Sequence, residues 1–248
     1  MHMIKKSADF EHMEKDFHFF WKPDELSLPN LQPSDSKGSV LRAKKVLAAI
    51  IHDITTLEGN PFTLEEVQSL INGITVSGRR VSDTEQVLNQ KASLQLLFDL
   101  VESNSFAVDK SIGLQLQSLA AKGEALEEGV FRTGKVGIKG TAYQPPTQGL
   151  ERTFDAMVEA HVRIENPIEK GIVTFLCVAR NQMFWDGNKR TGRLLMNGIL
   201  LTAGQEMITI PEREHNNFNK MMISFYETGN GTEMINFLSH LQIRYRLD

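Results

Sequence analysis

The residues of this chain best suited to chemistry lie in the stretch Phe184–Arg193, which reads Phe-Trp-Asp-Gly-Asn-Lys-Arg-Thr-Gly-Arg. The apolar run Ile172–Ala179 precedes this stretch, and Leu194–Leu201 follows it with apolar residues at helical spacing. The pattern predicts a tight turn at Asp186–Asn188 between two buried helices. Gly204 is placed to end the second helix.

A helix that begins directly after this turn would offer an anion site. Its first backbone N–H groups have no partner within the helix, and the helix dipole adds partial positive charge. Arg190 and Arg193 are three residues apart and therefore share a face beside the helix start. Asp186 supplies a carboxylate, which is a typical partner for Mg²⁺ beside phosphates. The stretch predicts binding of a polyphosphate together with Mg²⁺.

The overall composition is that of an ordinary globular protein. The chain has 248 residues, 41% of them hydrophobic and 23% charged, with a net charge of −4. No global basic field would attract nucleic acid, and no apolar run is long enough to span a bilayer. A cytoplasmic protein is expected, and the single cysteine, Cys177, is expected to pack in the core.

Three parts of the chain are expected. Residues 1–39 form an N-terminal extension, 40–110 a set of N-terminal helices, and 111–248 the core. The aromatic cluster within residues 17–21 is expected to dock on the main body, because exposed apolar patches are rare. The sequence Thr63-Leu-Glu-Glu66 predicts a capping box at a helix start.

One segment has a β signal. Residues 110–127 are expected to be helical, but the glycine-rich segment 129–146 that follows changes character. Within it, Val136 and Ile138 alternate with Gly137 and a lysine, which predicts a short strand bounded by glycines. A structural hairpin that covers the core is one interpretation of this segment.

The stretch that opened this section resembles the motif of Fic proteins. In that family, His-x-Phe-x-Asp/Glu-Gly-Asn-Gly-Arg-x-x-Arg begins a core helix. Gln182 stands at the position of the family's His, and Lys189 at that of its second Gly. The resemblance covers roughly residues 40–241 and implies a mainly α fold, a Fic-type helical bundle with a small β-hairpin flap. The matching positions are Phe184, Asp186, Gly187, Asn188, Arg190 and Arg193.

The resemblance also implies roles for these residues. Fic proteins transfer AMP from ATP to a protein hydroxyl. Asp186 would hold Mg²⁺, Gly187 and Asn188 would cradle phosphate, and Arg190 and Arg193 would grip the outer phosphates. The other side chain at the site, Lys189, is either a phosphate contact or a solvated lysine.

The segment at Val136, Gly137 and Ile138 resembles the Fic flap, which pins a target segment by strand addition. The implied partners are therefore ATP or another nucleotide and a protein that carries a hydroxyl side chain. Helix-rich domains of this size often pair, so a homodimer remains open.

A second resemblance lies before the core. Leu57–Asn60 reads Leu-Glu-Gly-Asn and is similar to the inhibitory helix of one Fic class, Ser/Thr-x-x-x-Glu-Gly/Asn. Ile54 occupies the Ser/Thr position, and Thr55 is adjacent. In the family this glutamate, here Glu58, pairs with the second motif arginine, here Arg193, and occupies donors meant for the γ-phosphate. The alternative is that Glu58 caps a surface turn.

The missing histidine decides the expected activity. The Gln182 amide has no usable proton affinity near neutral pH, and loss of a general base typically lowers a rate ~10²–10⁴-fold. His161 is the best-placed replacement, although a polar-face role is the simpler interpretation. The sequence thus predicts an ATP-binding Fic protein whose adenylyl transfer is weak or lost. The alternatives are a Doc-like kinase, which Lys189 favours, and a non-catalytic pseudoenzyme that binds nucleotide or protein.

Overall fold

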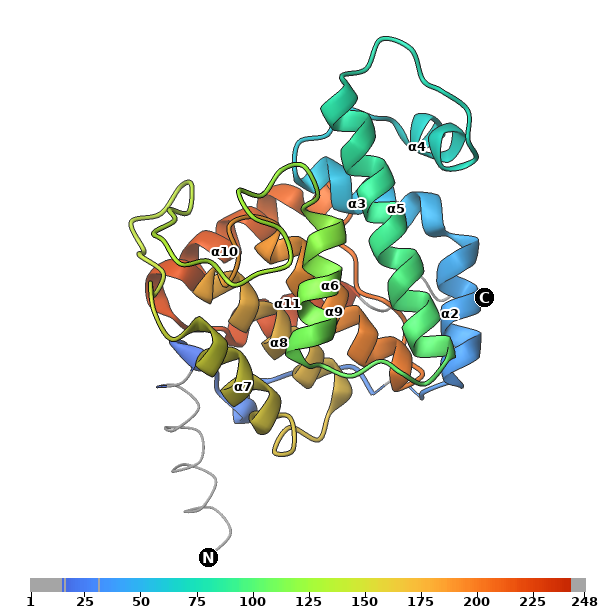
Figure 1. The fold of residues 1–248 in the computed structure, drawn as a ribbon. Helices are drawn as coiled ribbons and strands as arrows, with labels where there is room; N and C mark the ends of the chain where they lie inside the picture. Colours follow the sequence, from blue (N-terminus) through green and yellow to red (C-terminus); the bar gives the residue numbers. More distant parts are fainter. Residues whose placement is uncertain (1–14, 16, 31, 242–248) are drawn as a thin grey trace, which may run out of the picture.

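Two helices that are buried along most of their length form the centre of the fold (Figure 1). The structure is a computed structural model and describes residues 15, 17–30 and 32–241. Helix α8 (Pro167–Asn181) and helix α9 (Asn188–Thr202) pack against each other and are joined by the predicted turn. Both helices are apolar on several faces. Cys177 of α8 is fully buried in the core, as predicted. Such helices must be covered on all sides.

Eight further α-helices provide this cover in the part of the chain that the structure describes. In Figure 1, the helices before α6 lie on the right, and α7, α8, α10 and α11 lie on the left. Helices α5 and α6 contact α9, whereas α7 and α11 contact α8. The bounds are α2 Ser36–Lys45, α3 Leu47–Leu57, α4 Leu64–Ile71, α5 Val81–Glu102, α6 Lys110–Ala120, α7 Leu150–Ala160, α10 His215–Thr228 and α11 Thr232–Leu241, with short 3₁₀ turns at Pro23–Glu25 and Glu212–Glu214.

The aromatic cluster near the N-terminus docks on this bundle, as predicted. Phe17, Phe19 and Trp21 are each less than 5% exposed. The Phe19 ring meets Phe225 of α10 edge-on at 5.3 Å between centroids, and the Trp21 indole donates to Glu169 of α8 at 2.8 Å. Residues 1–14, 16 and 31 of the expected extension lie outside the described residues, as do residues 242–248 of the expected core.

Two local predictions have different outcomes. The capping box at the start of α4 is confirmed, with Thr63 and Glu66 each accepting the other's backbone N–H. The helix expected over 110–127 was too long: α6 ends at Ala120, and Leu126 is 76% exposed. Gly123 adopts a left-handed conformation at φ 74°, which interrupts the helix before the last apolar positions of the pattern.

The predicted hairpin is absent from the segment 129–146, all of which the structure describes. Val136 and Ile138 are half-buried while Gly137 between them is exposed, so the segment alternates as extended backbone does. Alternation sets the faces of a segment but does not supply a partner strand. No strand pairs with it within the described residues, so the prediction of a β-hairpin was wrong for this structure.

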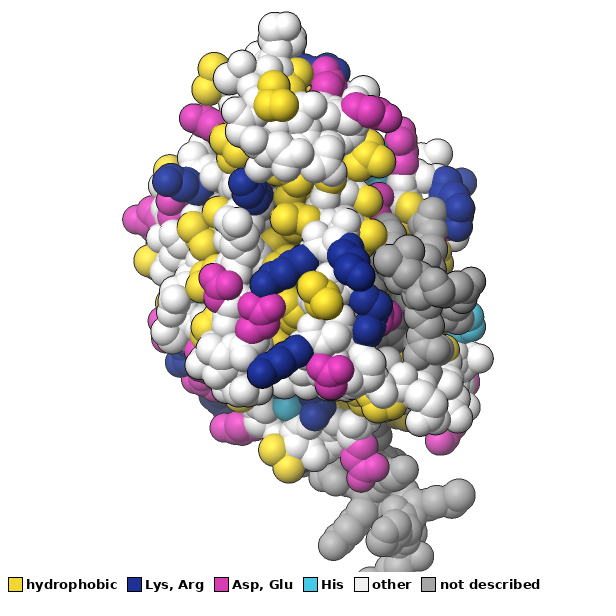
Figure 2. All heavy atoms as spheres, turned by 90° about the vertical axis from the view of Figure 1, so that its right-hand side faces the viewer, with side chains coloured by type: hydrophobic (Ala, Val, Ile, Leu, Met, Phe, Trp, Pro, Cys, Tyr) yellow, Lys and Arg dark blue, Asp and Glu magenta, His cyan; other side chains and the backbone are white. Residues whose placement is uncertain are grey.

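The face that includes α2 has mixed charge. Figure 2 shows Lys and Arg side chains there, with Asp and Glu side chains among them. Two ion pairs involve cations of α2: Lys44 pairs with Glu102 at 2.7 Å, and Arg42 pairs with Glu206. In residues 15, 17–30 and 32–241, no helix has the length and hydropathy that crossing a bilayer requires.

The close contact at the end of α9 depends on a glycine. Gly204 ends the helix in a left-handed conformation at φ 69°, as the sequence predicted, and its carbonyl accepts the Ser34 N–H at 2.8 Å. A Cβ at this position would lie 1.8 Å from the Ser34 carbonyl oxygen. Both the backbone angle and the approach of the segment before α2 therefore require glycine.

We expect Gly204→Ala to lower the free energy of unfolding by about 3 kcal/mol or more, from left-handed strain plus overpacking. Gly78→Ala is the matched control, because Gly78 has φ 74° but nothing within 4 Å of the added Cβ; strain alone lowers its stability by about 1–2 kcal/mol. Urea unfolding of both variants measures the difference. Equal losses would show that the Ser34 contact is unimportant.

Candidate functional site

The turn between α8 and α9 is closed by one side chain. Asn188 accepts the Phe184 N–H at 2.8 Å and donates to the Phe184 carbonyl at 2.8 Å and to Gln182 Oε1 at 3.2 Å. Gly187 before it is left-handed at φ 73°, and a Cβ there would lie 2.8 Å from that of Ala121. The turn therefore needs both residues, and the Asn188 side chain holds the loop closed.

A pocket of about 190 Å³ opens at this turn. It brings together predicted residues from three distant segments: the end of α3, the segment 129–146 and the motif loop. Of the predicted site residues, Ile138 and Arg193 do not line it; Arg193 lies beneath, 3% exposed, in contact with Glu58. The lining residues are Glu58, Val136, Gly137, Gln182, Trp185, Asp186, Gly187, Asn188, Lys189 and Arg190.

The Glu58 carboxylate reaches the cations of α9 from the end of α3. Its Oε1 accepts from Arg193 Nη2 at 3.1 Å, which is the pairing that the sequence predicted, and its Oε2 lies 3.4 Å from Lys189 Nζ. Burial alone would raise the pKa of Glu58, but the charges of Lys189, Arg193 and Arg190 together outweigh burial and lower it below 4.5. Glu58 is thus an anion held beside three cations; its inhibitory role stays a prediction.

The start of α9 has the composition expected of a candidate anion site. No side chain of the described residues caps this helix, and its first turn has no acidic residue. It carries Lys189 and Arg190 instead, although the positive end of the dipole disfavours cations there. Three cations, counting Arg193, thus gather where free amides already favour negative charge.

The two motif arginines are equally buried but differently bonded. Arg190 is 4% exposed and forms a two-pronged pair with Glu124, at 2.6 and 3.1 Å. Burial would lower its pKa, but Glu124, Glu58 and Asp186 raise it above the usual value. In Arg193, burial outweighs the effect of Glu58 and lowers the pKa. Nε and Nη1 of Arg193 are buried without a hydrogen-bond partner among the described residues.

Gln182 is bound on both sides of its amide. It ends α8 in a left-handed conformation at φ 45°, its Nε2 donates to the Ala179 carbonyl at 2.6 Å, and its Oε1 accepts from Asn188. His161 does not replace the missing histidine. The His161 ring forms a hydrogen bond with Thr174 at 2.8 Å, and Thr174 lies roughly 12 Å along α8 from Gln182. Burial lowers the pKa of His161 to about 4.

The sequence analysis missed the residue that attaches the segment 129–146 to the site. Arg132 is 3% exposed and donates to the carbonyls of Gln182, Asn181, Gly134 and Pro146. One guanidinium thus bridges the end of α8 and both ends of the segment that carries Val136 and Gly137. Nothing in the sequence distinguishes this arginine, because its acceptors are backbone groups.

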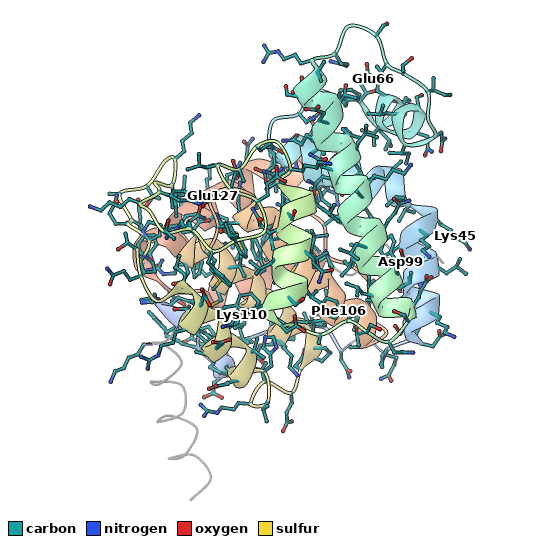
Figure 3. The ribbon with its side chains drawn as sticks, viewed as in Figure 1. Lys45, Glu66, Asp99, Phe106, Lys110 and Glu127 are labelled. Carbon is teal, nitrogen blue, oxygen red and sulfur yellow. The ribbon has the colours of Figure 1, made fainter. Side chains whose placement is uncertain are left out.

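An aromatic contact adds to this attachment. Trp185 of the motif loop packs on Gly134, where a Cβ would lie 2.5 Å from its ring, and its indole donates to Glu127 at 3.0 Å. Glu127, labelled in Figure 3, belongs to the connection between α6 and α7. The motif loop is therefore covered on one side by a fixed segment.

The residues present fit Mg²⁺ bound jointly with phosphate. Asp186 lines the pocket, and its side chain is 52% exposed. Mg²⁺ is usually held by one or two carboxylates plus substrate phosphates and water. The described residues contain no group of three or more His, Cys, Asp or Glu that could form an all-protein metal site. A single carboxylate, Asp186, at the edge of the pocket is consistent with Mg²⁺ that is held partly by the protein and partly by the phosphates of a ligand.

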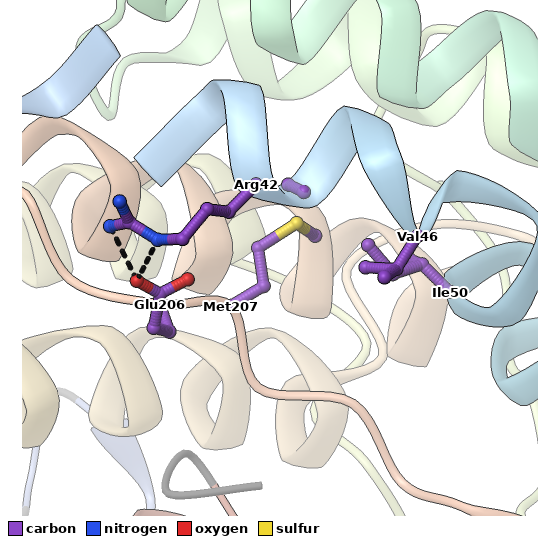
Figure 4. Close-up of a pocket in the computed structure, with 6 residues that line it drawn as sticks. Arg42, Val46, Ile50, Glu206 and Met207 are labelled. Atoms are coloured by element: carbon purple, nitrogen blue, oxygen red, sulfur yellow. Dashed lines mark hydrogen bonds and ion pairs between the residues drawn. The ribbon is translucent and has the colours of Figure 1, made fainter. Parts of the chain in front are cut away.

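A second cavity, shown in Figure 4, is too small for a ligand. It has about 10 Å³ beside the Arg42–Glu206 pair and is lined by Val46, Ile50 and Met207 among others. A space of this size holds about one water molecule. Of these two cavities, the motif-loop pocket is therefore the candidate site.

Comparisons with known proteins agree with this location. Residues 108–200 match the Fic/DOC family. The curated relative "Protein adenylyltransferase Fic" of Drosophila yakuba is 26% identical over 193 residues, which are 74% of this chain and 38% of the relative. The same figures hold for the Drosophila melanogaster protein of that name. The chain thus spans well under two thirds of the length of these relatives.

Two solved structures have a similar fold. Fic-1 of C. elegans superposes with a TM-score of 0.72 at 18% identity, covering 98% of this chain and 73% of that one. A Fic domain containing signaling protein from Bacteroides thetaiotaomicron gives 0.70 at 17% identity, covering 96% and 93%. The fold is a Fic-type helical bundle. Residues 108–200 of the chain carry a domain of the Fic/DOC family, and the motif lies inside these matched residues.

The Glu58 contacts predict a pH-dependent stability. Glu58→Gln mimics the protonated carboxyl and leaves Arg193 buried without its anion. We therefore expect this variant to have a free energy of unfolding about 3 kcal/mol lower than that of wild type at pH 7. A lowered folded-state pKa contributes stability above the ordinary value, and this contribution disappears as pH falls through the folded pKa. The gap between wild type and variant should therefore be constant above about pH 5 and close below pH 4.5.

Urea unfolding at a series of pH values measures this gap, and equal slopes of the two curves serve as the control that only stability changed. A gap that stays constant down to pH 3 would show that Glu58 is not the titrating anion.

Proposed function

We propose that the motif-loop pocket binds Mg-ATP and that the chain is a relative of protein adenylyltransferases whose transfer activity is weak or lost. The observation that supports nucleotide binding best is Arg193, a buried guanidinium with unpartnered Nε and Nη1 among the described residues. Buried donors are normally paired, so a phosphate that replaces Glu58 would complete its bonding. Lys189 and the first amides of α9 would contact the same group.

The present pocket is smaller than a nucleotide needs. Ligand pockets usually measure about 300–1,000 Å³, whereas this one has about 190 Å³ with the Glu58 carboxylate at its wall. Glu58 therefore limits the pocket in two ways, by volume and by its hold on Lys189 and Arg193. We infer that a triphosphate enters only when Glu58 leaves these cations, which makes Glu58 inhibitory.

Each remaining residue then has a task. Asp186 would hold Mg²⁺, which neutralises phosphate charge when bound. Asn188 keeps the loop closed, and Gly187 permits the left-handed turn on which the helix start depends. The extended backbone at Val136 and Gly137 lies at the pocket, where a target segment that carries a hydroxyl would pair with it by strand addition.

The chemical step lacks its base. In adenylyl transfer a target hydroxyl attacks the α-phosphorus, pyrophosphate leaves, and the hydroxyl proton must be accepted. Gln182 cannot accept it, and both ends of its amide are already bonded to Ala179 and Asn188. Loss of a general base lowers rates ~10²–10⁴-fold, which supports weak transfer or a purely binding role.

Calorimetric titration with Mg-ATP tests the binding proposal. We expect Glu58→Gly to bind at least about tenfold more tightly than wild type, because no ion pair must be broken; each tenfold step corresponds to about 1.4 kcal/mol. Glu58→Gln removes the charge of the side chain but not its volume, so its affinity for Mg-ATP should lie between those of wild type and Glu58→Gly. Arg193→Ala in the Glu58→Gly background should bind more weakly. Equal affinity of wild type and Glu58→Gly would contradict the inhibitory role.

Transfer is tested with ATP labelled at the α- or γ-phosphate and candidate target proteins. We expect Gln182→His in the Glu58→Gly background to raise α-label transfer by about 10²-fold or more over Glu58→Gly alone. The triple variant with Asp186→Ala is the control and should lose the gain. Label from the γ position alone would favour the kinase, to which Lys189 points. Binding without any transfer, even in Gln182→His, would favour the pseudoenzyme.

A further inference from the structure

The two terminal guanidinium nitrogens of Arg190 already donate to acceptors of the protein. Nη1 donates to the Ala120 carbonyl at 2.7 Å and to Glu124 Oε1 at 2.6 Å, and Nη2 donates to Glu124 Oε2 at 3.1 Å and to Asp186 Oδ1 at 3.2 Å. Each of these two nitrogens carries two hydrogens. All four of these hydrogens are therefore engaged, so the terminal nitrogens of Arg190 could grip a phosphate only by giving up a bond that they already make.

Arg193 differs in this respect, although its burial is the same. Its side chain is 3% exposed against 4% for Arg190, yet its one hydrogen bond among the described residues goes to Glu58, and Nε and Nη1 have none. The contrast comes from the partners and not from exposure. Arg193 has donors without a partner among the described residues, which a ligand could use, whereas Arg190 pairs with the Glu124 carboxylate.

That carboxylate is itself held in place. Glu124 follows α6, and its backbone N–H donates to the Ala121 carbonyl at 3.0 Å. Its Oε2 also accepts from Gln86 of α5 at 3.2 Å, and Gln86 Oε1 accepts from Asn60 at 3.0 Å. The pair with Arg190 therefore has support from two other elements, and a fixed pair of this kind fixes the direction of the Arg190 guanidinium.

We propose that Glu124 is a positioning residue for the metal end of the pocket: it locks Arg190 so that Arg190 orients the Asp186 carboxylate instead of gripping nucleotide. Asp186 Oδ1 takes its bonds from Arg190 Nη2 and from the Gly187 N–H. Residues that orient a metal ligand in this way typically change metal affinity or activity 10–100-fold when mutated. The inference rests on the proposed binding of Mg-ATP at this site.

The test compares ATP affinity in Mg²⁺ with ATP affinity in EDTA, using the full chain with Glu58→Gly as the parent. Glu124→Gln should lower the affinity in Mg²⁺ by about tenfold or more and leave the affinity in EDTA nearly unchanged. Arg193→Ala should lower both, because its donors meet phosphate directly. Glu128→Gln is the matched control: it lies in the same connection and accepts only the Gly123 N–H, which an amide oxygen also accepts.

Arg190→Lys supplies a second variant, which keeps the charge and loses the two-pronged pair. It should reproduce the Mg²⁺-specific loss, and combining it with Glu124→Gln should add little. Thermal unfolding confirms that each variant is folded. An equal fall in Mg²⁺ and EDTA, a rise in affinity, or no change in Glu124→Gln would each overturn the inference while leaving the proposed function standing. Absence of ATP binding in the parent would overturn the proposed function and the inference with it.

Discussion

The structure depends on the need of a buried guanidinium for an anion. Arg193 is 3% exposed in the second turn of α9, and an unpaired charge at such a depth is strongly unfavourable. The partner, Glu58, comes from 135 residues earlier in the chain. Its contact requires that the end of α3 lie against the start of α9, and it therefore joins the N-terminal helices to the motif. Under the proposed function, the same contact places a carboxylate at the position of a ligand phosphate.

The positive charges at the site are offset by an equal number of carboxylates of the same chain. Three cations, Lys189, Arg190 and Arg193, face three carboxylates from three elements, Glu58, Glu124 and Asp186. The balance is uneven in detail: both terminal nitrogens of Arg190 donate to protein acceptors, whereas Arg193 keeps buried donors without a partner among the described residues. Under the proposed function, an anionic ligand would gain Arg193 and would displace Glu58 from both Arg193 and Lys189. The same proposal assigns Arg193 to binding and Arg190 to positioning.

Most of the features that the sequence predicted correctly are local or repeat at helical spacing. Periodicity predicted α8 and α9, and glycine marked the turn and the end at Gly204. The exception is the Glu58–Arg193 contact, which joins distant segments and was predicted from the family pattern. The β-hairpin was wrong because alternation at Val136–Ile138 says nothing of a partner strand. Arg132 and Glu124 were missed because their roles come from backbone carbonyls and side chains of segments that only the fold brings near.

The most direct measurement of the central claim is a double-mutant cycle on the unfolding free energy, with Glu58→Gln and Arg193→Met made singly and together. If the two side chains are one buried pair, the losses will be strongly non-additive, with a coupling energy of about 1–3 kcal/mol. Additive losses, within about 0.5 kcal/mol, would contradict the account, because they would mean that α3 and α9 are not joined through this carboxylate and guanidinium.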